Sequence, residues 1–149
     1  AWGGQPLPYL RGRDDNNSDY SPKKKWDLEI SYKEIISKFG IEPKEIFVAY
    51  NNADRVEEIV FNDTKTTKSI TGDKFRIALG NNRIFSNYME IENDKKNERL
   101  LITGRGFGHG VGASQWGMYN LAKKGYNYQK IIKFYYQNVK IEDEQDVIF

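Results

Sequence analysis

The 149-residue sequence has no cysteine and only one histidine, His109. Disulfide bonds, thiol catalysis and cysteine-based zinc sites are therefore excluded within this sequence. No apolar run approaches the ~20 residues that a membrane-spanning helix needs. Basic and acidic residues are nearly balanced, 23 against 21, so there is no excess of positive charge of the kind that nucleic-acid binding requires. We expect a globular domain without metal ion, cofactor or nucleic-acid partner.

Aromatic residues are abundant in contrast, at 14% of the chain, with ten tyrosines and three tryptophans. This number exceeds what a small core needs. Some of these rings are therefore candidates for a surface that stacks on flat ligands or on the faces of sugars. The competing interpretation, that they all belong to the core and its half-buried shell, stays open at this point.

Proline and polar residues are concentrated in residues 1–25, which predicts an irregular arm or connecting segment. Residues 26–149 are predicted to form an α+β domain with a mainly antiparallel sheet, short helices and a C-terminal helical pair. The expected strands cover residues 26–30, 46–50, 56–61, 83–91 and 99–103. The expected helices begin at Ser31, at Thr71 or Asp73, at Ser114 and at Tyr128. Glu34, three residues after Ser31, predicts a capping box.

Residues 104–117 carry the most unusual pattern, Gly-Arg-Gly-Phe-Gly-His-Gly-Val-Gly-Ala-Ser-Gln-Trp-Gly. Glycine occupies every second position from Gly104 to Gly112. An extended segment would present bare backbone on one face, whereas a coiled segment would use the positive φ angles that glycine allows. Each glycine costs roughly 0.5–1 kcal/mol relative to alanine, so five of them favour a backbone that a ligand approaches closely. The alternative is a strained turn before the helix at Ser114.

The glycine pattern does not match a nucleotide-binding loop, because it has neither the Gly-x-Gly-x-x-Gly spacing nor a Gly-Lys-Ser/Thr ending. The Gly-x-Ser-x-Gly elbow of serine hydrolases is also missing. His109 stands between Gly108 and Gly110, whose lack of side chains leaves its ring unobstructed. We interpret His109 as a candidate for hydrogen bonding to a ligand. The alternative is a buried structural histidine.

The segment 104–117 resembles the signature of the stage II sporulation protein D family, which also includes amidase enhancers. That signature runs roughly Gly-x-Gly-Trp-Gly-His-Gly-Val-Gly-Met-Ser-Gln-Tyr-Gly-Ala. Residues 108–112 and the pair Ser114-Gln115 agree with it, whereas Phe107, Ala113, Trp116 and Met118 depart from it. Further similarity lies in residues 1–4 with 8–10, in Arg55-Val56, in residues 70–76 and in residues 122–136.

The resemblance implies a lytic transglycosylase that cleaves peptidoglycan glycan strands after a partner amidase has removed their stem peptides. In such enzymes one glutamic acid protonates the glycosidic oxygen and then assists closure of a 1,6-anhydro ring. The family has this glutamate, and in some members zinc-type ligands, in a region that would precede Ala1. No catalytic residue and no metal ligand is therefore transferred to this chain. The substrate-binding residues that the resemblance implies are Arg76, Arg105, Gly108, His109, Gly110, Ser114 and Gln115.

The same resemblance implies an extracytoplasmic protein whose parent is membrane-anchored by an N-terminal segment absent here. Its implied partners are glycan strands, a wall amidase and the membrane-anchoring components of the sporulation machinery. The chain alone is expected to be inactive, because the catalytic glutamate would lie upstream. The competing hypothesis is a non-catalytic amidase enhancer or glycan-binding module that stimulates a wall amidase.

Overall fold

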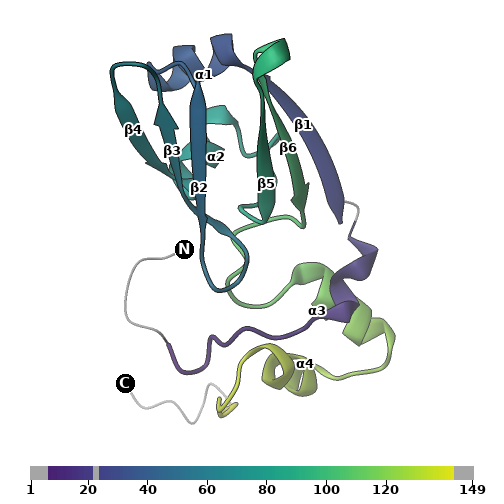
Figure 1. Cartoon of the computed structure of the whole chain (residues 1–149). Coiled ribbons are helices and arrows are strands. Elements are labelled where there is room, and N and C mark those ends of the chain that lie inside the picture. Colours follow the sequence, from purple (N-terminus) through teal and green to yellow (C-terminus); the bar gives the residue numbers. More distant parts are fainter. Residues whose placement is uncertain (1–6, 22–23, 143–149) are drawn as a thin grey trace. The chain divides into compact units, whose positions relative to one another are not determined.

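The computed structural model describes residues 7–21 and 24–142 (Figure 1). The chain divides into two compact units, which we call the sheet unit (Pro22–His109) and the helical unit (Ala1–Ser21 with Gly110–Phe149). The predicted domain boundary after residue 25 stays a prediction. The boundaries between the two compact units lie after Ser21 and after His109. The resemblance noted for residues 1–4 lies outside the described residues.

The sheet unit contains two three-stranded antiparallel sheets. In the first, β6 (Arg99–Arg105) lies between β1 (Lys25–Ser31) and β5 (Met89–Asp94). In the second, β3 (Val56–Asn62) lies between β2 (Glu45–Tyr50) and β4 (Thr67–Thr71). In β1 the buried Trp26 and Ile30 alternate with exposed charged residues, as the sequence pattern predicts. The predicted α+β class with antiparallel strands is confirmed.

Helix α1 (Tyr32–Phe39) follows β1 directly. The Ser31 hydroxyl caps it by accepting a hydrogen bond from the backbone N–H of Glu34, and Gly40 ends it with a left-handed φ of 68°. The Glu34 carboxylate pairs instead with Arg83, at 2.5 Å between Nη1 and Oε1. The cap predicted at Ser31 is confirmed, but Glu34 stabilises the 80–84 turn instead of closing a capping box.

Helix α2 (Gly72–Leu79) begins after β4. Thr71 is its N-cap and accepts a hydrogen bond from the backbone N–H of Lys74, so of the two predicted caps the structure selects Thr71. Asp73 accepts a hydrogen bond from Asn87 at 2.7 Å instead. Helix α2 is thereby tied to the segment that precedes β5.

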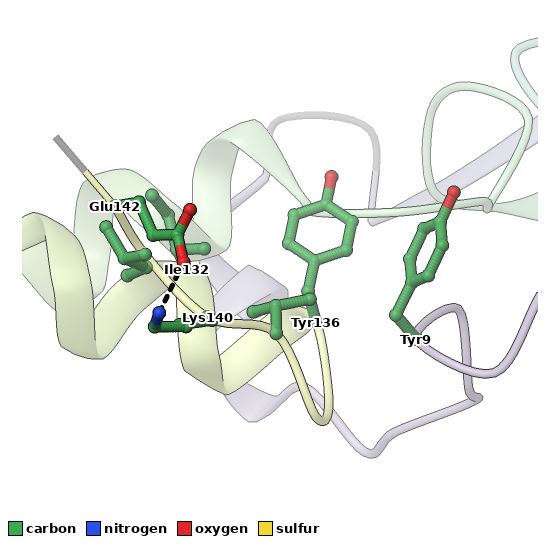
Figure 2. A pocket seen from close by; sticks show the side chains of 7 residues that line it. Tyr9, Ile132, Tyr136, Lys140 and Glu142 are labelled. Carbon is green, nitrogen blue, oxygen red and sulfur yellow. Dashed lines mark ion pairs between the residues drawn. The ribbon is translucent and has the colours of Figure 1, made fainter. Parts of the chain in front are cut away.

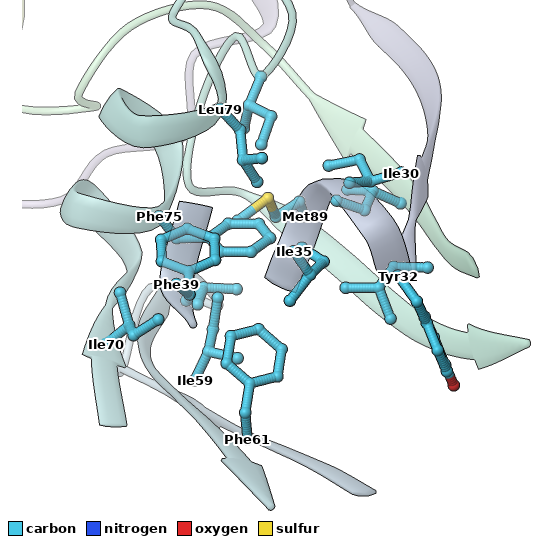
Figure 3. Close-up of a cluster of buried hydrophobic side chains, with 14 of the residues drawn as sticks. Ile30, Tyr32, Ile35, Phe39, Ile59, Phe61, Ile70, Phe75, Leu79 and Met89 are labelled. Atoms are coloured by element: carbon cyan, nitrogen blue, oxygen red, sulfur yellow. The ribbon is translucent and has the colours of Figure 1, made fainter. Parts of the chain in front are cut away.

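One hydrophobic core is shared by both sheets and both helices of the sheet unit (Figure 3). At its centre the rings of Phe39, Phe61 and Phe75 contact one another, with centroid distances of 5.6–6.2 Å. Phe61 and Phe75 are fully buried, and each buried ring of this size contributes roughly 1.5–3 kcal/mol to folding. This core fixes the strand ends on which the candidate site is built.

The helical unit contains a short 3-10 helix η1 (Asn16–Tyr20), α3 (Gln115–Lys123) and α4 (Tyr128–Tyr135). Leu121, Ile131 and Tyr135 form its core. Both helices predicted near the C-terminus are confirmed, with Ser114 and Asn127 as their caps. Helix η1 was not predicted from the polar run that contains it. No helix in the described part of the chain is long and apolar enough to cross a membrane.

Two strand predictions differ from the structure. Residues 83–91 were expected to form one strand, but only β5 (Met89–Asp94) is regular, and it continues past the predicted end. The residues before it form turns and an isolated bridge from Ser86. Strand β4 was missed, because its Thr-Lys-Ser-Ile-Thr sequence has one buried apolar residue and no clear alternation. A single turn, η2 (Lys95–Asn97), joins β5 to β6.

Candidate functional site

The glycine-rich segment leaves β6 and coils. Four successive alternate glycines, Gly106, Gly108, Gly110 and Gly112, have φ angles of 70°, 99°, 73° and 81°. This left-handed region is open to glycine at little cost and disfavours residues with a Cβ. Of the two predicted conformations the coiled one is confirmed. Gly104 differs, because it is still part of β6 and its backbone lies against Trp26.

The first half of this segment is held by residues 84–88 of the sheet unit. The backbone N–H of Gly108 donates to the Phe85 carbonyl at 2.7 Å, and Ser86 forms a parallel bridge with Gly108. The Ser86 side chain, 1% exposed, donates a short hydrogen bond to the Arg105 carbonyl. The indole N–H of Trp26 donates to the Gly106 carbonyl at 3.1 Å. These bonds give the segment a defined backbone despite its glycines.

A row of three aromatic rings crosses this end of the sheet unit. The rings of Trp26 and Phe85 meet edge to face at 5.7 Å, and Phe85 stacks on Phe107 at the same centroid distance with 30° between the ring planes. Phe107 is 66% exposed. A large exposed ring that stacks on a second ring, here Phe85 with Trp26 behind it, is typical of a binding surface. The interpretation that some aromatic residues serve recognition stays a prediction.

Two arginines lie within cation–π distance of one tyrosine, Tyr88. The guanidinium carbon of Arg105 lies 5.6 Å from the centre of the Tyr88 ring, and that of Arg55 lies 5.7 Å from the same ring. Both distances fall in the cation–π range. Burial lowers the pKa of Arg55, and the interaction with Tyr88 partly offsets this effect. Arg76 uses its Nε to donate to the Ile84 carbonyl at 2.9 Å, so it stabilises the turn before this site.

His109 is the last residue of the sheet unit and is exposed. The alternative of a buried structural histidine therefore does not hold. No group of three or more histidine, cysteine, aspartate or glutamate side chains that could hold a metal ion occurs within residues 7–21 and 24–142.

The remaining predicted site residues, Gly110, Ser114 and Gln115, belong to the helical unit. Ser114 Oγ accepts from the backbone N–H of Gly117 at 3.1 Å and lies 2.6 Å from Ser18 Oγ. Its hydroxyl is therefore engaged in capping α3 and in joining it to η1. Gln115, the first residue of α3, is exposed. The substrate-binding roles of all seven residues stay predictions.

A carboxylate holds the core of the helical unit together. Asp15 Oδ2 accepts hydrogen bonds from Ser18 at 2.5 Å and from the Tyr135 hydroxyl at 2.7 Å. Burial, followed by the hydrogen bond to Asp15, raises the pKa of Tyr135. A Cβ at position 117 would lie 1.8 Å from the Tyr135 oxygen, which explains the glycine at the end of the glycine-rich motif. The arm residue Asp15 is thus structural.

Exposed aromatic side chains also occur on α3. Trp116 and Tyr119 are 42% and 52% exposed and meet edge to face at 6.0 Å. Lys123 places its ammonium group 4.9 Å from the centre of the Tyr119 ring. Sequence reasoning noted the excess of aromatic residues but did not single these out, nor Phe85 and Tyr88. The i and i+3 spacing of Trp116 and Tyr119, which brings both side chains to one face of a helix, was the signal for these two residues.

The helical unit also has a groove of about 430 Å³ between α4 and the arm. Figure 2 shows the rings of Tyr9 and Tyr136 next to each other, and their centroids are 6.5 Å apart. Lys140 and Glu142 line the same groove and neutralise each other at 2.5 Å. The Tyr136 hydroxyl accepts from the backbone N–H of Ala113. This side chain therefore supports the second half of the glycine-rich segment.

Comparisons with known proteins find relatives of this chain. The chain is 32% identical over 94% of its length to an uncharacterized protein of Brachyspira hyodysenteriae, of which it covers 38%. It is 29% identical over 92% of its length to stage II sporulation protein D of Bacillus subtilis, of which it covers 39%. It is 37% identical over 48% of its length to the amidase enhancer of Bacillus subtilis, of which it covers 10%. No family model matches the chain.

The relatives with a functional name belong to a class of proteins named for sporulation and for amidase enhancement. The chain is related to the stage II sporulation protein D family, as the resemblance of its glycine-rich segment indicates. It spans about two fifths of the length of the sporulation relatives, 39% in each case. The activity, substrate and partners of the whole protein are therefore matters for a proposal.

Proposed function

We propose that this chain is the glycan-contacting part of a peptidoglycan lytic transglycosylase that acts on peptide-free strands during sporulation. A catalytic glutamate would be supplied from outside the chain, and the protein would work outside the cytoplasm, anchored to the membrane through another segment. A wall amidase that removes the stem peptides, and the anchoring components of the sporulation machinery, are its proposed partners.

The observation that carries this proposal is the exposed ring of Phe107, which stacks on Phe85 within the glycine-rich segment. A sugar ring has an apolar face that can lie on such an aromatic side chain, while its hydroxyl and N-acetyl groups need hydrogen-bond donors around it. Arg105 and His109 flank Phe107 at two residues on either side and are both exposed. The glycines between them leave the backbone open to close approach.

Binding of the 149-residue chain to purified, peptide-free peptidoglycan strands tests the proposal. We expect Phe107→Ala to weaken binding about tenfold or more, because loss of a stacking ring in a recognition site costs roughly 1–3 kcal/mol. Phe47→Ala is the matched control, since Phe47 on β2 is also highly exposed, at 58%, and belongs to the same unit. Equal affinity of the wild-type chain and Phe107→Ala would contradict the proposal.

The catalytic part of the proposal is tested separately. The chain alone should release no anhydro-ended fragments from peptide-free strands, as measured by mass spectrometry, because its catalytic acid would be supplied from elsewhere. Release well above the buffer control would show that one of the chain's own carboxyl groups is the acid.

A second candidate function is a non-catalytic amidase enhancer. The 37% identity to the amidase enhancer over 71 residues favours it. The two functions differ in one measurement, the rate of peptide release by a wall amidase in the presence of the chain. A several-fold increase in that rate without glycan cleavage by the complete protein would favour the enhancer.

A further inference from the structure

Three cationic side chains gather at the end of β6 in the sheet unit. Arg105 and Arg55 lie on the Tyr88 ring, with their guanidinium carbons 5.6 Å and 5.7 Å from its centre. Lys25 is the direct cross-strand partner of Arg105 in the β1–β6 ladder. Like charges directly opposite each other destabilise a sheet. The placement of Lys25 opposite Arg105 therefore has a physical reason other than the stability of the sheet.

No carboxylate of the described residues forms an ion pair with Arg55 or Arg105. Glu90, two residues beyond Tyr88, interacts with Tyr50. Burial is the main cause that raises the pKa of Tyr50, and the negative charge of Glu90 is the second cause. Two other arginines of this unit differ, because Arg83 pairs with Glu34 and Arg99 pairs with Glu29 and Asp94.

The most direct observation for an anion site concerns the guanidinium group of Arg55. Its Nη1 is buried and has no hydrogen-bond partner among the described residues. A buried N–H group without a partner costs roughly 1–3 kcal/mol, and more when it is charged. The backbone of Arg55 is held in place, since Asn51 caps the β2–β3 turn by accepting from the backbone N–H groups of Ala53 and Arg55, and its guanidinium lies within cation–π distance of the Tyr88 ring. A guanidinium fixed in this way is pre-organised to bind an anion.

The chemistry of the anion follows from the geometry and from the proposed substrate. The planar guanidinium fork matches a carboxylate, with two parallel N–H donors. Hydrolysis of the amide bond that links a stem peptide to muramic acid leaves a free carboxylate on that sugar. A peptide-bearing strand has an uncharged amide at the same place.

We propose that Arg55 and Arg105, each within cation–π distance of the Tyr88 ring, form a subsite for the free lactyl carboxylate of muramic acid. This subsite rests on the proposed function and supplies a physical cause for a preference for peptide-free strands. A site whose donors are arranged for a carboxylate discriminates strongly against an analogue that lacks it, because the donors are then left unpaired.

The test measures the affinity of the 149-residue chain for three soluble glycans of equal length by titration calorimetry. The first is a peptide-free muramic-acid glycan, the second is the same glycan with its carboxylates converted to methylamides, and the third is a chito-oligosaccharide. We expect the first to bind about tenfold or more tightly than the others, since a charge-assisted pair is worth roughly 1.5–3 kcal/mol. Raising the salt concentration should reduce this difference.

Arg55→Met should lower the affinity for the first glycan toward that of the second and leave the second unchanged. Arg105→Met should lower the affinity for the first glycan more than the affinity for the second, because Arg105 also lies beside Phe107 in the proposed glycan site. Arg105→Met is the safer variant for folding because Arg105 is exposed. Arg99→Met is the matched control, at the opposite end of the same strand β6. Melting temperatures of all variants show whether the sheet unit stays folded.

Equal affinities for the first and second glycans would overturn the carboxylate subsite and leave glycan binding intact. Failure of all three glycans to bind would overturn the proposed function together with the subsite. Competition by a free stem peptide as effective as the muramic-acid glycan would assign the arginines to peptide carboxylates instead. Competition by inorganic phosphate at a concentration at which acetate has no effect would assign them to a phosphate, and would equally overturn the proposal.

Discussion

The backbone of Gly104 lies directly against the indole ring of Trp26, so that a Cβ at position 104 would be 2.0 Å from the ring carbon Cζ2. The two residues are cross-strand partners in the β1–β6 ladder. Trp26 also donates its indole N–H to the Gly106 carbonyl. Because Gly104 has no side chain, the Trp26 ring can pack against its backbone, and from there it donates a hydrogen bond to the Gly106 carbonyl.

Gly104→Ala is expected to destabilise the sheet unit by roughly 1–3 kcal/mol, because a methyl group in this position forces the Trp26 ring to move. Thermal unfolding followed by circular dichroism measures the effect as a lower melting temperature. Gly12→Ala serves as the control, since nothing lies within 4 Å of a Cβ there. An unchanged melting temperature of Gly104→Ala would show that the ring and the strand can separate at little cost.

Gly110→Val is expected to abolish binding to peptide-free glycan strands. Gly110 has a φ of 73°, a conformation that is a genuine outlier for a β-branched residue. The backbone of the segment would have to change around His109. Gly125→Val is the control, since Gly125 also has a positive φ, 84°, but lies after α3 and outside the motif.

Both glycine variants are expected to lose some stability, and only Gly110→Val should lose glycan affinity. The measurement is the fraction of chain bound to insoluble strands at several glycan concentrations. A folded Gly110→Val variant with wild-type affinity would mean that the segment is a tolerant linker between the two units.

Tyr135→Phe is expected to lower the stability of the helical unit by roughly 1.5–3 kcal/mol at neutral pH, because the hydrogen bond to the Asp15 carboxylate is lost. Burial raises the pKa of Tyr135 in the folded state above its value in the unfolded chain. The unfolded chain therefore loses this proton at a lower pH than the folded one. The contribution of Tyr135 is fully present below about pH 10 and declines as the pH rises above that value.

Denaturant unfolding at pH 7 and across the range above pH 10 checks this prediction. The wild-type chain should lose stability with rising alkaline pH more steeply than Tyr135→Phe. Tyr128→Phe is the control, as Tyr128 is 61% exposed at the start of the same helix. Parallel pH profiles of the wild type and Tyr135→Phe would show that Tyr135 does not carry the linkage.

The sequence predicted those parts of the fold that local chemistry decides. Helix starts at Ser31, Thr71 and Ser114 depend on a hydroxyl and the next few N–H groups, and all three are confirmed. The full capping box at Ser31 was wrong because Glu34 finds a stronger partner in Arg83, 49 residues away. Such a long-range ion pair leaves no trace in the spacing of neighbouring residues.

The candidate site was predicted only in part, again because contacts between distant residues leave no trace in the spacing of neighbouring residues. The alternating glycines marked the segment, and their positive φ angles bear out the coiled interpretation. The partners that hold it were missed, because Phe85, Ser86 and Tyr88 belong to a stretch predicted as regular strand. Only the fold brings Arg55, from the β2–β3 turn, to the ring of Tyr88. No sequence spacing connects these two residues.

The last prediction concerns His109, which we expect to orient a glycan by hydrogen bonding and not to ligate a metal ion. It is exposed and is flanked by two glycines with positive φ, at 99° and 73°. Zinc sites take three or four ligands from histidine, cysteine and carboxylates, and the described part of the chain holds no such group. Arg105 and Phe107 belong to the same exposed end of the sheet unit and would contact the same sugar residues.

His109→Gln keeps a hydrogen-bond donor and an acceptor but removes the titratable ring. We expect it to weaken glycan binding about tenfold with a nearly unchanged melting temperature, because an exposed side chain adds little to stability. Gln115→Ala, another exposed residue of the motif, shows how much a neighbouring polar group contributes. A large fall in melting temperature with normal affinity would establish a structural role for His109. Stoichiometric zinc retained by the wild-type chain and lost in His109→Gln would overturn the prediction that no metal is bound.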